Sequence, residues 1–214
     1  ALTPVPPGRP MRIVETSVYL GPSLYAHFPV IRFDLDLGPV EAWPTSRLGP
    51  QFNDALFAAL PGLLEHGCSY GDAGGFRRRV LEDEGTWLGH VLEHVAIELQ
   101  NVAGASVTFG KTRSTGVPGR YHVVFEYEQE EVGLEAGRLA LTLLHALLPE
   151  ELRPERSVPA DFDFAEERDA FIPFAQRRAL GPSTGSLVHA AEARDIPWMR
   201  LNDASLIQFG WGRY

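Results

Sequence analysis

Cysteine is nearly absent from this chain of 214 residues, since Cys68 is the only one. One cysteine excludes an intramolecular disulfide framework, and we take it to exclude a cysteine-based zinc site within one chain. Any metal is therefore expected to be held by histidine and carboxylate. Long apolar runs are also missing: no segment approaches the about 20 residues needed to cross a bilayer, and no secretory segment is expected. We expect a cytoplasmic protein with no membrane partner.

Basic residues are in deficit, with 19 Lys and Arg against 28 Asp and Glu and a formal net charge of −9. Nucleic acid attracts basic faces and repels acidic ones, so we expect no nucleic-acid partner. An acidic surface suits a cationic partner better. With 44% hydrophobic and 22% charged residues, the chain is expected to fold around one substantial core.

The most informative pattern in the sequence is H-x-x-E-H, formed by His90, Glu93 and His94. Residues four apart share one face of a helix, so both imidazoles could bind one ion. Glu93 lies on the same side and could take a proton from a metal-bound water. The spacing is typical of the inverted zincins, a class of zinc hydrolases. Three fixed positions in five also arise by chance in amphipathic helices.

The residues around this pattern favour the metal interpretation. Apolar residues at helical spacing predict that the two histidines lie beside a buried face, where desolvation keeps imidazole neutral and able to bind a metal. Thr86 is expected to cap this helix, and Gly104 to follow its end. The apolar stripe consists of Leu88, Val91, Leu92, Val95, Leu99 and Val102.

Alternating and helical periodicities outline the rest of the chain. The basic segment 110–116 is expected to be a loop, and it lacks the G-x-x-x-x-G-K-[ST] order of a phosphate-binding loop. Strands and long helices in this order indicate an α+β fold, with helices packed on a mixed or antiparallel sheet. Strands are expected at 11–19, 30–37, 107–109 and 121–127. Helices are expected at 53–65, interrupted or ended near Pro61 and Gly62, and at 130–148.

The chain is expected to divide into three regions. Residues 1–10 contain four prolines and are expected to be a disordered lead-in. Residues 11–160 would form the main domain. Residues 161–214 would form a linker and a small C-terminal α/β appendage.

Within this appendage, a helix is expected from 181 to 194 and a strand over 196–201. Phe209, Trp211 and Tyr214 lie close to the end of the sequence. Three aromatic residues there are expected to pack into the core or at a subunit interface. We expect a homo-oligomer.

A catalytic zinc site generally has three protein ligands, so a third donor is needed beside the two histidines. Glu130 and Glu131, in the first turn of the second long helix, are the expected candidates, and the sequence does not decide between them. Gly133 and Gly137 would let one face of that helix approach another helix closely. First-turn carboxylates are also favoured by the helix dipole without any metal, and Glu131 could pair with Arg138. The expected ion is Zn²⁺, with another divalent metal as the alternative.

Three other residues near the pattern are expected to have no part in the site. Glu98 lies a further turn beyond the second histidine and is expected to be too distant to bind the same ion. His66 is expected to be an ordinary surface or core histidine. Cys68 is expected to be a packed thiol, because no local positive cluster would activate it.

Several blocks of the sequence together resemble the N-terminal domain of the cyanophycin synthetases, a family that this chain matches over nearly its whole length after Met11. The resemblance continues into the start of the family's ATP-grasp region. The blocks are Glu65–Ser69, Gly74–Phe76, Glu84–His94, Glu98–Gln100, Phe109–Arg113, Tyr121–Tyr127, Ala136–Arg138, Gly181–Thr184, Ile196–Asn202 and Gln208–Gly210.

The resemblance implies a function tied to cyanophycin, a poly-Asp backbone that carries Arg on each side chain. Family members continue with an ATP-grasp and a Mur-ligase-like domain, which this sequence does not contain, so ligase activity is not expected. In many members the N-terminal domain is similar to a metallopeptidase that cuts the polymer. A domain with His90, Glu93 and His94 intact is therefore expected to be a zinc-dependent cyanophycin hydrolase, or cyanophycinase.

In this hypothesis Glu93 acts as the general base for a zinc-bound water that attacks the poly-Asp backbone. Lys111, Arg113 and Arg138 are the expected substrate-binding residues, which would meet the α-carboxylates of the polymer or the developing oxyanion. Two alternatives remain open. The chain could be a non-catalytic module that binds cyanophycin or scaffolds an assembly, or the excised N-terminal part of a synthetase.

Overall fold

In the computed structural model, residues 10–202, 204–210 and 212 are described. The predicted lead-in therefore lies outside the described residues except for Pro10. The predictions for Trp211 and Tyr214 lie outside them as well. Phe209 is exposed, at 45% of its surface, and so does not pack into the core as one of the two expectations had it.

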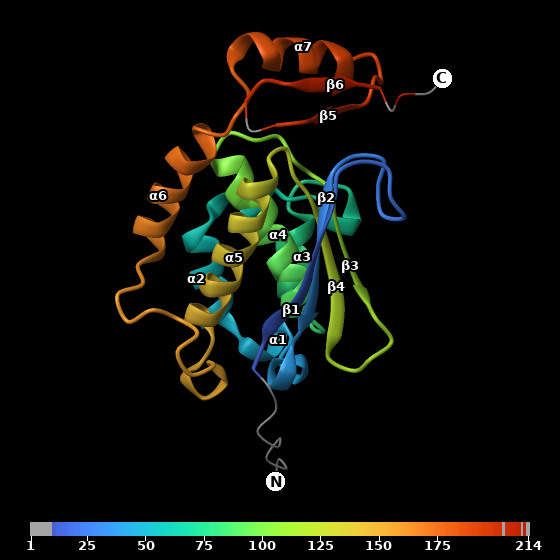
Figure 1. Ribbon diagram of the computed structural model, residues 1–214. Helices are drawn as coiled ribbons and strands as arrows, with labels where there is room; N and C mark the ends of the chain where they lie inside the picture. Colours follow the sequence, from blue (N-terminus) through green and yellow to red (C-terminus); the bar gives the residue numbers. More distant parts are fainter. Residues whose placement is uncertain (1–9, 203, 211, 213–214) are drawn as a thin grey trace.

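An antiparallel sheet of four strands forms one layer of the main domain (Figure 1). Its strands lie in the order β1-β2-β4-β3, so β1 and β3 are the two edges. Helices pack against one face of this sheet, and the predicted α+β fold class is confirmed. The strands are β1 (Arg12–Tyr19), β2 (Val30–Asp36), β3 (Gly110–Ser114) and β4 (Arg120–Glu126).

Side chains of β2 alternate between a buried face and an exposed face of the sheet, as expected for a half-buried strand. Ile31, Phe33 and Leu35 of β2 are fully or almost fully buried against the helices. Arg32 and Asp34, between them, point to the opposite face, where they form an ion pair of 3.0 Å. One face of the sheet therefore belongs to the core, and the other carries charged side chains.

Two long helices, α4 (Leu88–Val102) and α5 (Glu130–Leu147), form the layer on the sheet. The predicted glycines of α5 do allow a close approach, but mainly to the sheet. A side-chain carbon at Gly133 would meet Ile31 and Tyr127, and one at Gly137 would overlap the ring of Phe33. These positions fix the depth at which α5 lies on β2 and β4.

The remaining elements surround this pair of layers. None of the helices in the described part of the chain has both the length and the apolar character that a bilayer crossing requires. A second sheet, β5-β6, lies with α7 at the C-terminal end of the described chain (Figure 1). The elements are η1 (Gly38–Ala42), α1 (Thr45–Leu48), α2 (Pro50–Ala59), η2 (Pro61–Glu65), η3 (Cys68–Tyr70), α3 (Gly75–Leu81), η4 (Glu150–Leu152), α6 (Phe164–Gln176), α7 (Pro182–Glu192), β5 (Trp198–Arg200) and β6 (Ile207–Phe209).

The prediction for the segment around Gly110 was wrong. The expected strand at 107–109 is not one, and the expected loop at 110–116 contains β3. Basic and hydroxyl side chains are tolerated in β3 because it is an edge strand that is only partly covered. The helix expected from residue 53 starts earlier, at Pro50, while its expected interruption near Pro61 is confirmed, because α2 ends at Ala59 and the 3₁₀ turn η2 follows from Pro61.

Candidate metal centre and its groove

Helix α4 places His90 and His94 one turn apart on the face that meets the sheet and η3. His94 is buried and His90 is partly buried. Their Nε2 atoms are 3.1 Å apart. Thr86 does not cap the helix as predicted, since the N-cap is Trp87 without a side-chain cap. The Thr86 hydroxyl instead contacts Nδ1 of His90 at 2.9 Å.

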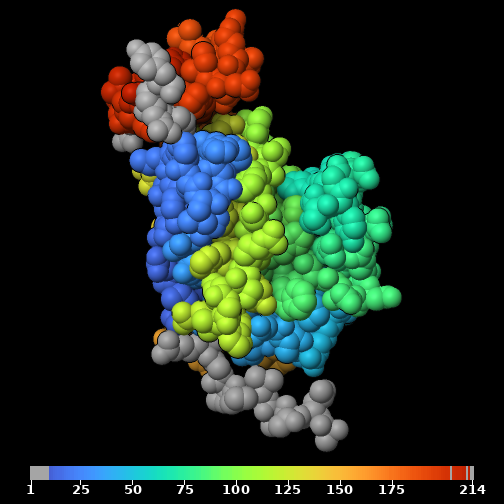
Figure 2. Space-filling view, turned by 90° about the vertical axis from the view of Figure 1, so that its right-hand side faces the viewer, coloured from blue at the N-terminus to red at the C-terminus, as the bar shows by residue number. Residues whose placement is uncertain are grey.

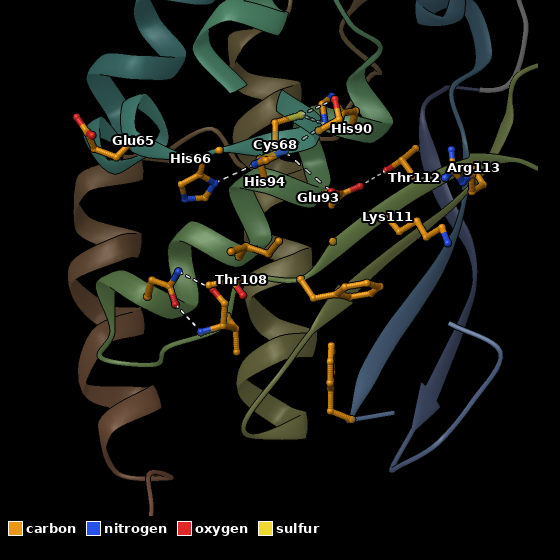
Figure 3. A pocket seen from close by; sticks show the side chains of 18 residues that line it. Glu65, His66, Cys68, His90, Glu93, His94, Thr108, Lys111, Thr112 and Arg113 are labelled. Atoms are coloured by element: carbon orange, nitrogen blue, oxygen red, sulfur yellow. Dashed lines mark hydrogen bonds and ion pairs between the residues drawn. The ribbon is translucent and has the colours of Figure 1, made fainter. Parts of the chain in front are cut away.

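Cys68 is the third member of this cluster. Its Sγ lies 3.2 Å from Nε2 of His90, and one donor atom from each of Cys68, His90 and His94 lies within 4.8 Å of the other two (Figure 3). Cys68 has a backbone φ of 54°, a left-handed conformation that residues other than glycine rarely adopt. Such a backbone persists only where its surroundings fix it, and here it turns the thiol toward the histidines.

Hydrogen-bond partners outside the cluster bear on which nitrogens of His90 and His94 carry protons. His66 contacts Glu98 through Nε2 at 2.9 Å and His94 through Nδ1 at 2.9 Å. Because the carboxylate accepts, His66 carries its proton on Nε2, and His94 must donate from Nδ1. The Thr86 hydroxyl can either accept from Nδ1 of His90 or donate to it. His94 therefore turns an Nε2 lone pair into the cluster, and His90 does the same when Thr86 accepts from its Nδ1.

In the tautomer in which Thr86 accepts from His90, two Nε2 lone pairs face each other at 3.1 Å beside a sulfur, and they repel unless a cation lies between them. Burial lowers the pKa of His90 to about 4, with a smaller contribution from Arg79, so a proton does not readily fill this role. Burial also holds the pKa of His94 well below its ordinary value, and the neighbouring His90 and His66 add to the effect. The cluster is therefore a set of neutral donors suited to a metal ion.

Glu93 is buried beside this cluster, with one oxygen 4.0 Å from Nε2 of His94. Its other oxygen accepts a hydrogen bond of 2.5 Å from the hydroxyl of Thr112 on β3. Burial raises the pKa of Glu93 to about 8, although the hydrogen bond from Thr112 and the charge of Arg113 oppose the rise. A side chain at Gly110 would overlap this carboxylate, so glycine is needed there.

The cluster lines a groove of about 830 Å³. One wall is formed by β3, the other by the segment Glu65–Ser69, and α4 contributes His90, Glu93 and His94. Figure 2 faces this side of the molecule, where the surface is recessed between the yellow-green β3 region and the teal segment. Phe28 and Phe109, which contact edge to face, line part of the same groove.

The predicted substrate-binding residues fall into two groups. Lys111 and Arg113 of β3 both line the groove. Arg138 does not, because it lies exposed on α5, where its guanidinium is 3.5 Å from Glu135. The three residues share a positive charge but not a location.

The structure does not bring the predicted third ligands, Glu130 and Glu131, to the histidines. They line a different cavity of about 690 Å³, between the start of α5 and the C-terminal strands. Glu131 forms an ion pair with Arg178 rather than with Arg138. The physical reason is that the N-terminal turn of α5 packs toward the appendage.

Sequence reasoning missed Cys68 and the outer partners His66 and Glu98. The expectation that any metal is held by histidine and carboxylate alone does not fit this cluster, because one thiol can join two histidines without forming a cysteine-rich site. His66 and Cys68 are two residues apart, and that spacing is the signal that could have found them. Glu98 is too far from the cluster to join it but holds it through His66.

The fold and this donor set define a small α+β domain with a histidine and cysteine cluster in a groove. Residues 31–149 match the model of the cyanophycin synthase-like N-terminal domain. The chain is 40% identical over 204 residues to cyanophycin synthetase of Crocosphaera subtropica, and 41% identical to those of Geminocystis herdmanii and Nostoc sp.. Each comparison covers 94% of this chain but 22% of the relative.

The chain therefore belongs to the cyanophycin synthetase N-terminal domain family, as its sequence blocks implied. It spans about a fifth of the length of these curated relatives. The prediction of a cyanophycin-hydrolysing metallopeptidase is contradicted, because the relatives are named as synthetases. The H-x-x-E-H spacing indicates where a metal could bind but does not determine a reaction. The catalytic role predicted for Glu93 depended on that hydrolase.

Proposed function

We propose that this chain is a non-catalytic module that binds cyanophycin, as the N-terminal domain of a synthetase. The family assignment supports the polymer as ligand. The observation that carries the proposal is the groove, which has cations on one wall and a carboxylate on the other. Lys111 and Arg113 stand on β3, and Glu65 lies on the opposite segment.

Each repeat of the polymer carries a guanidinium and a free α-carboxylate, so its side groups are charged in both senses. Lys111 and Arg113 can meet carboxylates, while Glu65 can meet a guanidinium. Neither Lys111 nor Arg113 belongs to an ion pair within the described part of the chain. Both cations are therefore open to an anionic ligand.

Co-sedimentation with insoluble cyanophycin tests this proposal. The wild-type chain is expected to pellet with the polymer at low salt and to be released as salt rises, because exposed ion pairs are screened. Arg138→Glu, which reverses a cation outside the groove, is the control and should pellet as the wild type does. Recovery of the chain in the supernatant at low salt would exclude the function. Arg-containing fragments should not appear in solution.

We further propose that Cys68, His90 and His94 hold Zn²⁺. Two imidazoles and one thiolate form a donor set common in zinc sites, and the neutral histidines need no deprotonation. A bound ion would connect η3, one wall of the groove, to α4. Elemental analysis of the protein purified without added metal should find about one zinc per chain. A metal-free protein with unaltered stability would exclude this role.

A further inference from the structure

The free edge of β3 lies along the groove. Phe109 accepts a backbone hydrogen bond from Glu126, and Thr115 donates one to Arg120, both across to β4. The register places Lys111 and Arg113 opposite β4 residues at the positions between these two pairs. In an antiparallel pair, bonded positions alternate along the strand. The odd-numbered residues of β3 are therefore bonded to β4.

The even-numbered residues Gly110, Thr112 and Ser114 consequently point their backbone N–H and C=O groups away from β4. Because β3 is the last strand in the sheet order, no described segment pairs with this side. The edge is an open template for another extended chain. All four residues Gly110–Arg113 line the groove, so a chain paired with this edge would lie in the groove.

Side-chain alternation specifies what that chain must carry. Thr112 points toward α4, where it bonds Glu93, so Lys111 and Arg113 point to the other face of the sheet. These two cations are two residues apart, which is about 6.6–6.8 Å along a strand. Alternate side groups of an added strand have the same spacing. Anionic groups on every second residue of that strand would therefore lie beside Lys111 and Arg113.

We propose that the groove binds an extended peptide backbone as a fifth strand on β3, with carboxylates on its outward side groups. This inference deepens the proposed polymer binding and rests on it. The backbone hydrogen bonds would supply affinity for any extended chain, and the two cations would select an acidic one. The inward side groups would pass over Glu93 and toward Glu65 on the opposite wall.

Amide hydrogen exchange measured by NMR, with short soluble cyanophycin segments as the probe, tests the pairing directly. The amides of Gly110, Thr112 and Ser114 should become protected when the segments bind. Those of Lys111 and Arg113, already bonded to β4, should be unchanged. Protection without this alternation would overturn the fifth-strand inference while leaving polymer binding intact. Failure of the segments to bind would instead remove the proposed function.

Two variants test the same inference by affinity. The double variant Lys111→Glu/Arg113→Glu should weaken binding about tenfold, whereas Arg138→Glu should not. Thr112→Pro removes one outward N–H and should weaken binding about fivefold relative to Thr112→Val, which keeps it. Equal affinities within both comparisons would overturn the inference. If Thr112→Pro does not fold, the charge reversal and the exchange pattern decide.

Discussion

Replacing Glu93 by glutamine should stabilise the metal-free protein at neutral pH. The carboxyl is 4% exposed, and its pKa is raised from 4.5 to about 8 by burial. The folded state therefore holds a proton that the unfolded state releases above pH 4.5. For a raised carboxyl pKa, stability is fully present below the unfolded value and is lost as pH rises toward the folded one.

The size of the effect follows from the pKa difference. Between pH 4.5 and pH 7 the loss is up to about 3 kcal/mol, at about 1.4 kcal/mol per pH unit, and it levels off near pH 8. Glutamine has no proton to lose, and its carbonyl can still accept from Thr112. The variant should therefore gain stability over wild type as pH rises through this window.

Urea unfolding of chelator-treated protein at pH 5, 6, 7 and 8 measures the difference. Glu65→Gln, which removes an exposed carboxylate, is the control and should show no comparable trend. Added zinc should shrink the gap, because a nearby cation favours the ionised carboxylate. Wild type and Glu93→Gln with equal stability at every pH would refute the reasoning.

Three other outcomes are expected. Cys68→Ser should lower the zinc content of the purified protein, whereas Ser69→Ala should not; equal zinc in both would exclude the thiol as a ligand. Gly137→Ala should destabilise the fold by about 1–3 kcal/mol because the new carbon overlaps Phe33. Gly185→Ala, in open space on α7, should stabilise the fold by up to about 1 kcal/mol. Calorimetry distinguishes the two variants. Burial lowers the pKa of His145, so below pH 6.5 the unfolded histidine gains a proton before the folded one does. The wild type should therefore lose stability relative to His145→Gln as pH falls below 6.5. Parallel curves of stability against pH for the two proteins would contradict this.

Most of the secondary structure was predictable from periodicity. The alternation in β2 and the apolar stripe of α4 each place one face in the core, and both elements were predicted to within two residues. β3 was missed because an edge strand of basic and hydroxyl residues has no buried face to impose alternation. Its pairing with β4, across the short connection 115–119, depends on a register that composition does not encode.

The candidate site was only half predictable for a related reason. His90, Glu93 and His94 lie on one helix, where spacing alone determines proximity. Cys68 and His66 come from a different segment, so no helical spacing predicts their contacts with His90 and His94. The left-handed backbone of Cys68 gives no signal in the sequence either. Glu130 and Glu131 at the start of α5 could also be explained without a metal, by the helix dipole or by pairing with an arginine. Glu131 does form an ion pair with an arginine, Arg178.

The separation of Cys68 from His90 by 22 residues has a consequence for how the groove is held together. A metal ion bound by both Cys68 and His90 would act as a removable cross-link. It would close a loop of the chain much as a disulfide does. In the chain-entropy account, a loop of this length is worth about 3 kcal/mol to the folded state. A chelator would therefore release the wall of the groove formed by Glu65–Ser69, while the sheet and the long helices remain intact.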